Sequence, residues 1–151
     1  MNDFENVRGS TMTTLPSHPF GTKITATDVQ DTLASCEGWE NRYRALIKWG
    51  KLLPSLSDAE KTASVPIPGC ESQVWLLCKK NNETFHFSAD SDARIVKGLL
   101  AVVLAVSEGK KKSQLQDFDY EKYFEQLELL SHLSESRGNG LRAIVNFIKC
   151  L

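Results

Sequence analysis

The stretch VPIPGCESQVW, residues 65–75, decides how the rest of the chain is organised. Its two prolines and its glycine exclude a helix and a central strand, while the residues that follow favour a β-strand. Cys70 lies at the tip of this stretch, and Gly69 beside it allows a sharp turn or the close approach of another surface. The pattern predicts one thiol on a stiff loop in front of a sheet. Two interpretations stay open: Cys70 carries chemistry, or it packs as a small hydrophobic residue.

Two β-prone runs follow this loop. Ser72–Cys78 is rich in strand-forming residues, and Thr84–Ser88 alternates phenylalanine with histidine. The polar residues 79–83 between them are typical of a turn, so the pair is predicted to form an antiparallel hairpin, with room for a third strand. A hairpin of this kind must pack on helices to be stable.

The strongest helix pattern covers Asp92–Ser107. Residues 98–106 are apolar on all sides of the helix, which indicates a buried central helix. Asp90 or Ser91 is expected to cap it, with Asp92 in its first turn. Because Asp90 and Asp92 are both carboxylates, a metal site is the alternative interpretation of this motif.

The other helices are predicted from capping residues and helical periodicity. A short helix starts after Thr25 or Thr27, a second runs from Trp39 to about Leu53, and Gly50 on its buried face indicates close packing. Ser57 can begin one further helical turn, and the last two helices are capped by Asp119 and Ser134. The order predicts an α+β fold with one domain over residues 21–151 and a tail over residues 1–20.

Composition limits the possible functions of the 151-residue chain. With 18 basic and 19 acidic residues the net charge is −1, so neither nucleic acid nor a membrane is expected as a direct partner. The run Lys110–Lys112 is interpreted as a solvated helix end. Four scattered cysteines and three scattered histidines suggest neither a disulfide framework nor a metal site. No signal sequence or membrane-spanning run is recognised, and a cytoplasmic protein with reduced thiols is expected.

A functional Cys70 needs a positive neighbour that stabilises its thiolate. Arg137 is a candidate because it lies in the first turn of the last helix, where the helix dipole disfavours a cation and two nearby glycines lower helix propensity. An ordinary surface arginine beside a flexible turn is the alternative. A cysteine hydrolase would instead need a histidine base, and His86 is more simply explained as lying on the opposite, exposed face of the sheet.

Four motifs in order carry a resemblance to a known family. They are Tyr43-x-x-Leu46-Ile47-x-x-Gly50-x-x-Leu53-Pro54, Gly69-Cys70-x-Ser72-x-Val74-Trp75, Asp90-Ser91-Asp92-Ala93-x-Ile95-Val96-x-Gly98-Leu99 and Leu133-Ser134-x-Ser136-Arg137-x-x-Gly140-Leu141. On these residues the chain resembles the SufE family of sulfur acceptors over about residues 18–150. The start His18-Pro19-Phe20-Gly21 is similar to the CsdE branch of that family.

The resemblance implies a persulfide carrier with a SufE-like fold. Cys70 would accept sulfane sulfur from a cysteine desulfurase of the CsdA or SufS type, stimulate that enzyme, and pass the sulfur to a downstream acceptor or scaffold protein. The destination would be iron–sulfur cluster assembly or another pathway such as tRNA modification. Pyridoxal phosphate would belong to the desulfurase, so this chain is expected to bind no cofactor and to have no independent turnover.

The resemblance also implies roles for individual residues. Arg137 matches an arginine that favours the anionic form of the cysteine, and Asp92 matches an acidic position that controls the loop or docks the partner, together with Gly69 and Glu71. Glu71 departs from the glutamine of the SufE branch, and a carboxylate there disfavours the thiolate. A non-catalytic interaction module is the alternative function, and an independent thiol enzyme is a third. The remaining cysteines, which are Cys36, Cys78 and Cys150, are expected to be packing residues.

Overall fold

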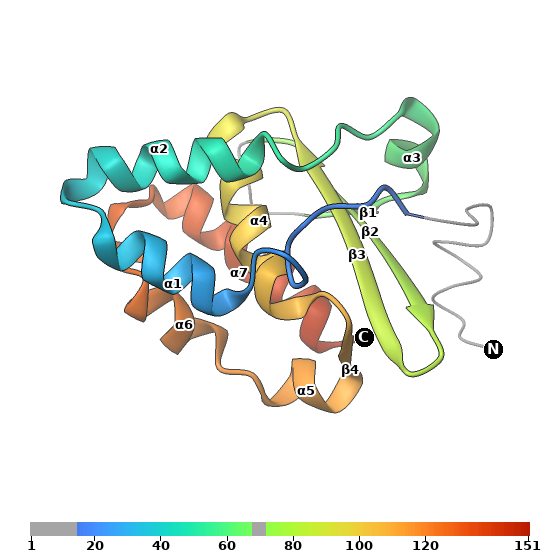
Figure 1. Cartoon of the computed structure of the whole chain (residues 1–151). Coiled ribbons are helices and arrows are strands. Elements are labelled where there is room, and N and C mark those ends of the chain that lie inside the picture. Colours follow the sequence, from blue (N-terminus) through green and yellow to red (C-terminus); the bar gives the residue numbers. More distant parts are fainter. Residues whose placement is uncertain (1–14, 68–71) are drawn as a thin grey trace.

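The computed structural model describes residues 15–67 and 72–151 and has the predicted α+β architecture (Figure 1). The predicted site residues Gly69, Cys70 and Glu71 lie outside the described residues. The helices are α1 (Ala26–Ser35), α2 (Gly38–Gly50), α3 (Asp58–Ala63), α4 (Arg94–Ser107), α5 (Lys112–Asp117), α6 (Tyr120–Gln126) and α7 (Glu135–Lys149), with a 3₁₀ turn η2 (Leu130–His132). The strands are β1 (Val65–Pro66), β2 (Val74–Asn81), β3 (Thr84–Ser91) and β4 (Lys110–Lys111).

The sheet is antiparallel with the strand order β1-β2-β3-β4. The predicted hairpin is confirmed as β2 and β3, although both strands run three residues beyond the predicted ends. Asn82 makes the tight turn between them with φ of 59°, a left-handed conformation that asparagine tolerates. The two outer strands have only two residues each, so the hairpin supplies nearly all of the sheet.

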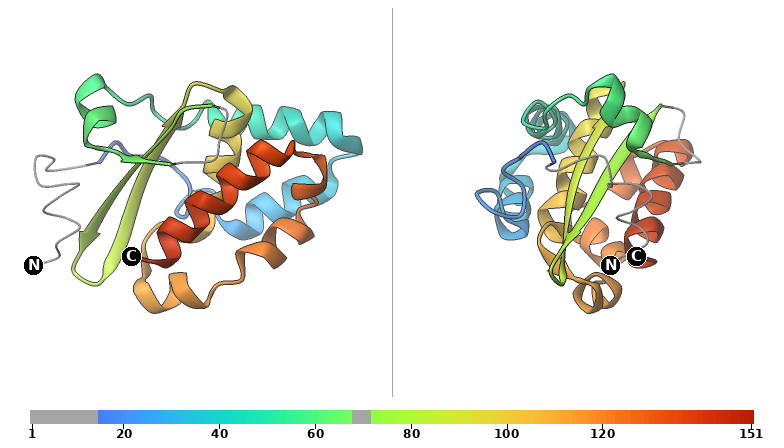
Figure 2. Two further views of the ribbon diagram at one scale, coloured as in Figure 1. Left: turned by 180° about the vertical axis from the view of Figure 1, so that it is seen from behind. Right: turned by 90° about the vertical axis from the view of Figure 1, so that its right-hand side faces the viewer.

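Helix α4 is the buried centre of the molecule, as its all-round apolar sequence predicts. All its residues from Gly98 to Ser107 are buried. It packs against β3 and also contacts α1, α2 and α7, and Figure 2 shows it enclosed between the α1–α2 pair and α7. The remaining core side chains come mainly from the hairpin and from the faces of these helices.

Two glycines allow α2 and α4 to touch through their backbones. A Cβ atom placed on Gly98 would lie 2.2 Å from the carbonyl oxygen of Leu46, and one on Gly50 would lie 2.8 Å from the backbone nitrogen of Gly98. Any larger side chain at these positions would push the helices apart. The prediction that Gly50 marks close packing is therefore confirmed.

The start of α4 differs from the prediction. Asp90 and Ser91 are the last residues of β3, Asp92 follows the strand, and α4 begins at Arg94 without a side-chain cap. Helix propensity and strand pairing compete at this junction, and pairing with β2 wins because Ser91 lies opposite Val74. Among the described residues, no group of three or more histidine, cysteine or acidic side chains could hold a metal ion.

Other predicted boundaries also shift. Phe20, which the sequence assigns to the tail, is fully buried, so packed structure begins before residue 21. Lys110 and Lys111 do not end a helix but form β4, which pairs with Phe85 and Thr84 of β3. Helix α2 ends at Gly50, before the predicted end at Leu53. Four predicted caps are confirmed, namely Thr25, Ser57, Asp119 and Ser134. No helix in the described ranges is long and apolar enough to cross a membrane.

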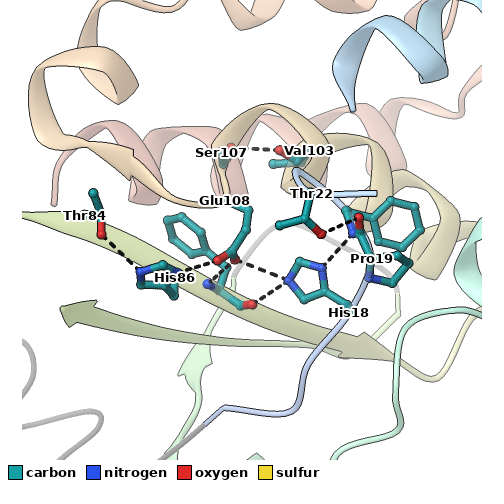
Figure 3. A network of polar contacts seen from close by, with 10 residues as sticks. His18, Pro19, Thr22, Thr84, His86, Val103, Ser107 and Glu108 are labelled. Carbon is teal, nitrogen blue, oxygen red and sulfur yellow. Dashed lines mark hydrogen bonds and ion pairs between the residues drawn. The ribbon is translucent and has the colours of Figure 1, made fainter. Parts of the chain in front are cut away.

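A buried polar network attaches the N-terminal segment to β3 and to the end of α4 (Figure 3). His18 Nδ1 accepts from the backbone N–H of Phe20 at 3.1 Å, which leaves Nε2 to donate to the carbonyl of Phe87 at 2.8 Å. Glu108 accepts from the Phe87 N–H at 2.8 Å and contacts His86 Nδ1 at 2.6 Å. Burial opposes ionisation of Glu108, but the hydrogen bonds from His18, Phe87 and His86 outweigh it and hold the pKa of this carboxyl below its usual value.

The same network explains the position of His86. Its side chain is 38% exposed and bonded to Glu108, with Thr84 Oγ1 at 3.1 Å from its other ring nitrogen. The contact of Nδ1 with Glu108 therefore ties strand β3 to the end of α4, while the other nitrogen bonds within β3. The interpretation of His86 as a structural histidine on the face opposite Phe85 and Phe87 agrees with this arrangement.

Candidate functional site

The candidate site is the end of the sheet at which segment 68–71 is attached. Strand β1 pairs with β2, with Val65 opposite Leu76 and Pro66 opposite Trp75. The chain leaves this pairing at Ile67, which packs on the core, and β2 begins at Val74. Residues 67–73 therefore join two antiparallel neighbours, and the predicted loop at Cys70 lies outside the described residues.

The upstream side of this connection is firmly held. The sequence predicts only a single helical turn here, but helix α3 spans Asp58–Ala63 behind a capping box formed by Ser57 and Glu60. Lys61 on α3 places its ammonium group 4.2 Å from the ring centroid of Trp75 on β2, a cation–π contact. The stretch between α2 and the loop is thus an ordered element docked on the strand that follows the loop.

Asp90 supports the same region from inside the protein. Its carboxylate is buried and accepts from the backbone N–H of Leu56 at 3.0 Å and from that of Ser91 at 2.8 Å. Lys97 Nζ lies 3.3 Å from Asp90 Oδ1, so the buried charge is paired. Asp90 therefore holds the chain that enters α3 against the end of β3.

Gln73 fixes the downstream side of the connection. Its N–H donates to Asp92 Oδ1 at 3.1 Å, and its carbonyl accepts from Ser91 Oγ at 2.7 Å and from the Asp92 N–H at 3.4 Å. Both backbone polar groups of this residue are bound to the end of β3 and the residue after it. Asp92 thus lies beside the chain three residues after Cys70, where the resemblance implies a loop-controlling role, although it acts from outside α4.

Arg137 reaches the same end of the sheet from α7. Ser134 caps this helix by accepting from the Arg137 N–H at 3.2 Å. The arginine is half-buried and lines a small pocket together with Val74 of β2, apolar residues of α4, and Gly140 and Leu141 of α7. The structure thus brings Arg137 to Val74, the first residue of the strand that follows Cys70, and its role stays a prediction.

The guanidinium of Arg137 has an unsatisfied donor. Its Nε atom is buried and has no hydrogen-bond partner among the described residues, and the side chain forms no ion pair in that part of the chain. The pocket beside it has a volume of about 10 Å³, which leaves room for one water at most. Since an anion would satisfy a buried guanidinium N–H that has no acceptor, this side chain offers a place for negative charge at the sheet end.

The other thiols lie elsewhere. Cys78 is buried in the core within β2, as predicted, while Cys36 is half-buried and donates to the carbonyl of Thr32 at 3.2 Å. Cys150 is exposed, so its assignment as a packing residue is wrong. Sequence reasoning also missed Gln73 and the Lys61–Trp75 contact, for which no local signal exists because both depend on which strands become neighbours.

Comparisons with known proteins identify the family of the chain. The family model described as "SufE: Fe-S metabolism associated domain" matches residues 27–151. The chain is 45% identical over 128 residues to "Sulfur acceptor protein CsdE" of Escherichia coli (strain K12), covering 84% of this chain and 87% of that protein. It is 42% identical to an uncharacterized SufE-like protein of Haemophilus influenzae, covering 80% and 97%.

A solved structure supports the fold. The solution structure of a hypothetical protein from Thermus thermophilus matches with a TM-score of 0.63 at 15% identity, covering 83% of this chain and 90% of that one. At this identity the likeness concerns the arrangement of helices and strands alone.

Proposed function

We propose that this chain, which belongs to the SufE family, is a sulfur acceptor of Fe–S metabolism that receives sulfur on Cys70 from a cysteine desulfurase. The family match and the similarity to a protein named sulfur acceptor support the general function. The acceptor residue, the persulfide and the stimulation of the desulfurase are the parts that the proposal adds.

The chemical step is a thiolate attack on a persulfide. The Cys70 thiolate attacks the outer sulfur of the persulfide on the desulfurase cysteine, and the sulfur–sulfur bond of that donor persulfide breaks. A new sulfur–sulfur bond forms on Cys70, and the electron pair of the broken bond leaves on the donor cysteine as a thiolate. The step needs no external oxidant or reductant. The pyridoxal phosphate that generates the donor persulfide would be held by the desulfurase.

The observation that carries the proposal is the unsatisfied Nε of the Arg137 guanidinium. This buried atom lies beside a pocket lined by Val74, four residues after Cys70. A thiolate or a terminal persulfide sulfur is an anion that a guanidinium stabilises by charge-assisted hydrogen bonding. Arg137 would thus favour the reactive form of Cys70 before transfer and the anionic persulfide after it.

The fixed flanks of the segment suit a carrier. Gln73 is bonded through both backbone groups to Ser91 and Asp92, and β1 is paired with β2. Cys70 would be presented from this anchored frame to the desulfurase, and afterwards to a downstream acceptor or scaffold protein. We place the destination of the sulfur in Fe–S cluster assembly or in another sulfur-using pathway such as tRNA modification.

Intact-mass spectrometry tests the carrier function directly. The protein is mixed with L-cysteine and a cysteine desulfurase of the CsdA or SufS type, and a reducible gain of one sulfur atom is expected on the wild type. Cys70→Ser should lose this gain, while Cys150→Ser, which removes an exposed thiol, should keep it. If the wild type gains no sulfur and Cys70→Ser still stimulates the desulfurase fully, the chain is an interaction module instead.

A further inference from the structure

A groove lies between α2 and the start of α4, on a surface that the proposed sulfur chemistry does not use. It has a volume of about 380 Å³ and is lined by Tyr43, Arg44, Ile47, Lys48, Lys51 and Arg94. The positions 43, 47 and 51 are spaced by four residues and share one face of α2, with 44 and 48 on the adjoining row. The groove is therefore a continuous strip along the helix.

The floor of the groove is apolar and accessible. Tyr43 in the groove is 41% exposed, while Leu52, just after α2 and outside the groove, is 45% exposed. These two are the most exposed large hydrophobic side chains within residues 15–67 and 72–151. Ile47, half-buried beside Tyr43, continues the apolar strip. A tyrosine that offers an apolar ring and a polar tip is typical of the centre of a protein interface.

The rim of the groove is positively charged. Lys48, Lys51 and Arg94 are exposed, and none of them forms an ion pair with another residue of the described chain. Arg44 pairs with Glu40 at 2.8 Å, one turn earlier on α2. No carboxylate among the described residues lines the groove. Since the whole chain has a net charge of −1, this cluster is a local concentration of positive charge.

The close packing of the two helices creates this arrangement. Gly50 and Gly98 let the backbones of α2 and α4 touch, which brings Arg94 at the start of α4 beside the last turns of α2. Arg94 follows Asp92 by two residues, and Asp92 holds Gln73. The groove therefore ends close to the anchored flank of the candidate site.

We infer that this groove docks an acidic segment of a second protein. One large apolar side chain of that segment would pack on Tyr43 and Ile47, and carboxylates on either side of it would meet Lys48, Lys51 and Arg94. Charge complementarity identifies the occupant as acidic, and the exposed apolar floor requires more than a polyanion. The inference is independent of whether Cys70 carries sulfur.

The test uses a synthetic peptide with a central leucine flanked by three glutamates on each side, labelled with a fluorophore and titrated with the full chain by anisotropy. Lys48→Glu combined with Lys51→Glu should weaken binding about tenfold or more, since two attractive pairs become repulsive. Tyr43→Ser should weaken it about fivefold through the loss of buried apolar area.

Matched controls separate the groove from general charge and general hydrophobicity. Lys112→Glu combined with Lys122→Glu makes the same charge change at exposed positions on α5 and α6 and should change affinity less than about twofold. Leu52→Ser removes the other exposed hydrophobic side chain, which does not line the groove, and should also have little effect. Circular dichroism of each variant checks that its fold is retained.

Three results would overturn the inference. One is equal binding of a peptide in which the central leucine is serine, or of a single-stranded oligonucleotide, because charge alone would then explain the affinity. The second is an equal loss of affinity in the α5 and α6 control variant. The third is self-association in sedimentation equilibrium that Lys48→Glu with Lys51→Glu abolishes, because the groove would then be covered by a second copy of the chain.

Discussion

Replacement of Gly98 by alanine tests the packing that places α4 against α2. The added Cβ would lie 2.2 Å from the carbonyl oxygen, 2.6 Å from the carbonyl carbon and 2.9 Å from the Cβ of Leu46. Two of these three atoms belong to the backbone of α2, so no side-chain rotation relieves the overlap. The two helices must separate along their contact, which also disturbs Gly50 on the opposite side.

The expected loss of stability is large for a single added methyl group. Overpacking in a well-packed core costs about 1–3 kcal/mol, and a contact between two backbones lies at or above the upper end. The gain in helix propensity from glycine to alanine offsets at most about 1 kcal/mol. We expect Gly98→Ala to lower the free energy of unfolding, measured by urea denaturation, by about 2 kcal/mol or more.

Gly138 on α7 provides the matched control. A Cβ there would meet only Arg142 Nη1, at 3.7 Å, which is an ordinary contact with a flexible side chain. Gly138→Ala should therefore leave stability unchanged or raise it by about 0.5–1 kcal/mol. If Gly98→Ala also stays within about 1 kcal/mol of the wild type, the reasoning that the glycine contact fixes the α2–α4 spacing is refuted.

Three further predictions concern charged residues. Because the folded pKa of Glu108 is depressed, its contribution to stability is present above the unfolded pKa of 4.5 and is lost as the pH falls through the folded pKa. The difference in the free energy of unfolding between wild type and Glu108→Gln, measured in urea, should therefore shrink between about pH 5 and pH 3. A difference that stays constant over this range would contradict the prediction. Asp90→Asn should lower the free energy of unfolding by about 2–4 kcal/mol, because it leaves Lys97 unpaired. In a double-mutant cycle, adding Lys97→Met should recover part of this loss. Arg137→Ala should slow the alkylation of Cys70 by iodoacetamide about tenfold at neutral pH and leave the unfolding midpoint unchanged. Arg137→Lys should slow the alkylation less, because it keeps the positive charge. An unchanged alkylation rate in Arg137→Ala would remove Arg137 from the site.

Local sequence signals predicted those parts of the fold that depend on local physics. The hairpin of β2 and β3 and the buried helix α4 follow from strand-forming residues and an all-round apolar run. The helix caps follow from side chains that bond to their own helix, as Thr25 does with Asp28. Such features need no knowledge of which elements become neighbours.

The errors arise where tertiary contacts decide between local alternatives. Asp90 and Ser91 look like helix caps, but pairing with β2 extends the strand through them and leaves α4 to start later. Lys110 and Lys111 look like the solvated end of a helix, but they pair with the edge of β3 and form β4. Phe20 looks like part of a tail because prolines precede it, while a buried position beside the His18 network holds it in the core.

The candidate site also combines features that local sequence signals predict with features that only tertiary contacts determine. The sequence singles out Arg137 because a cation and two glycines in the first turn of α7 oppose local helix stability. The structure supplies the missing half of that argument, since the side chain lines a pocket where its Nε has no acceptor among the described residues. Asp92 is singled out by its motif, but its bond to Gln73 depends on the register between β2 and β3 and could not be foreseen.

Under the proposed function, a sulfur acceptor must position its cysteine and stabilise the charge on it, and different residues at this end of the sheet suit these two tasks. Positioning is assigned to buried or satisfied groups: Asp90 is bonded through both carboxylate oxygens, and both backbone groups of Gln73 are occupied. In our proposal Arg137 stabilises the charge, and its Nε donor has no acceptor within the described structure. If Asp92 and Arg137 served only to hold the fold, both would be satisfied in the same way. The difference between them supports our proposal, in which Asp92 positions the chain after Cys70 and Arg137 stabilises an anion.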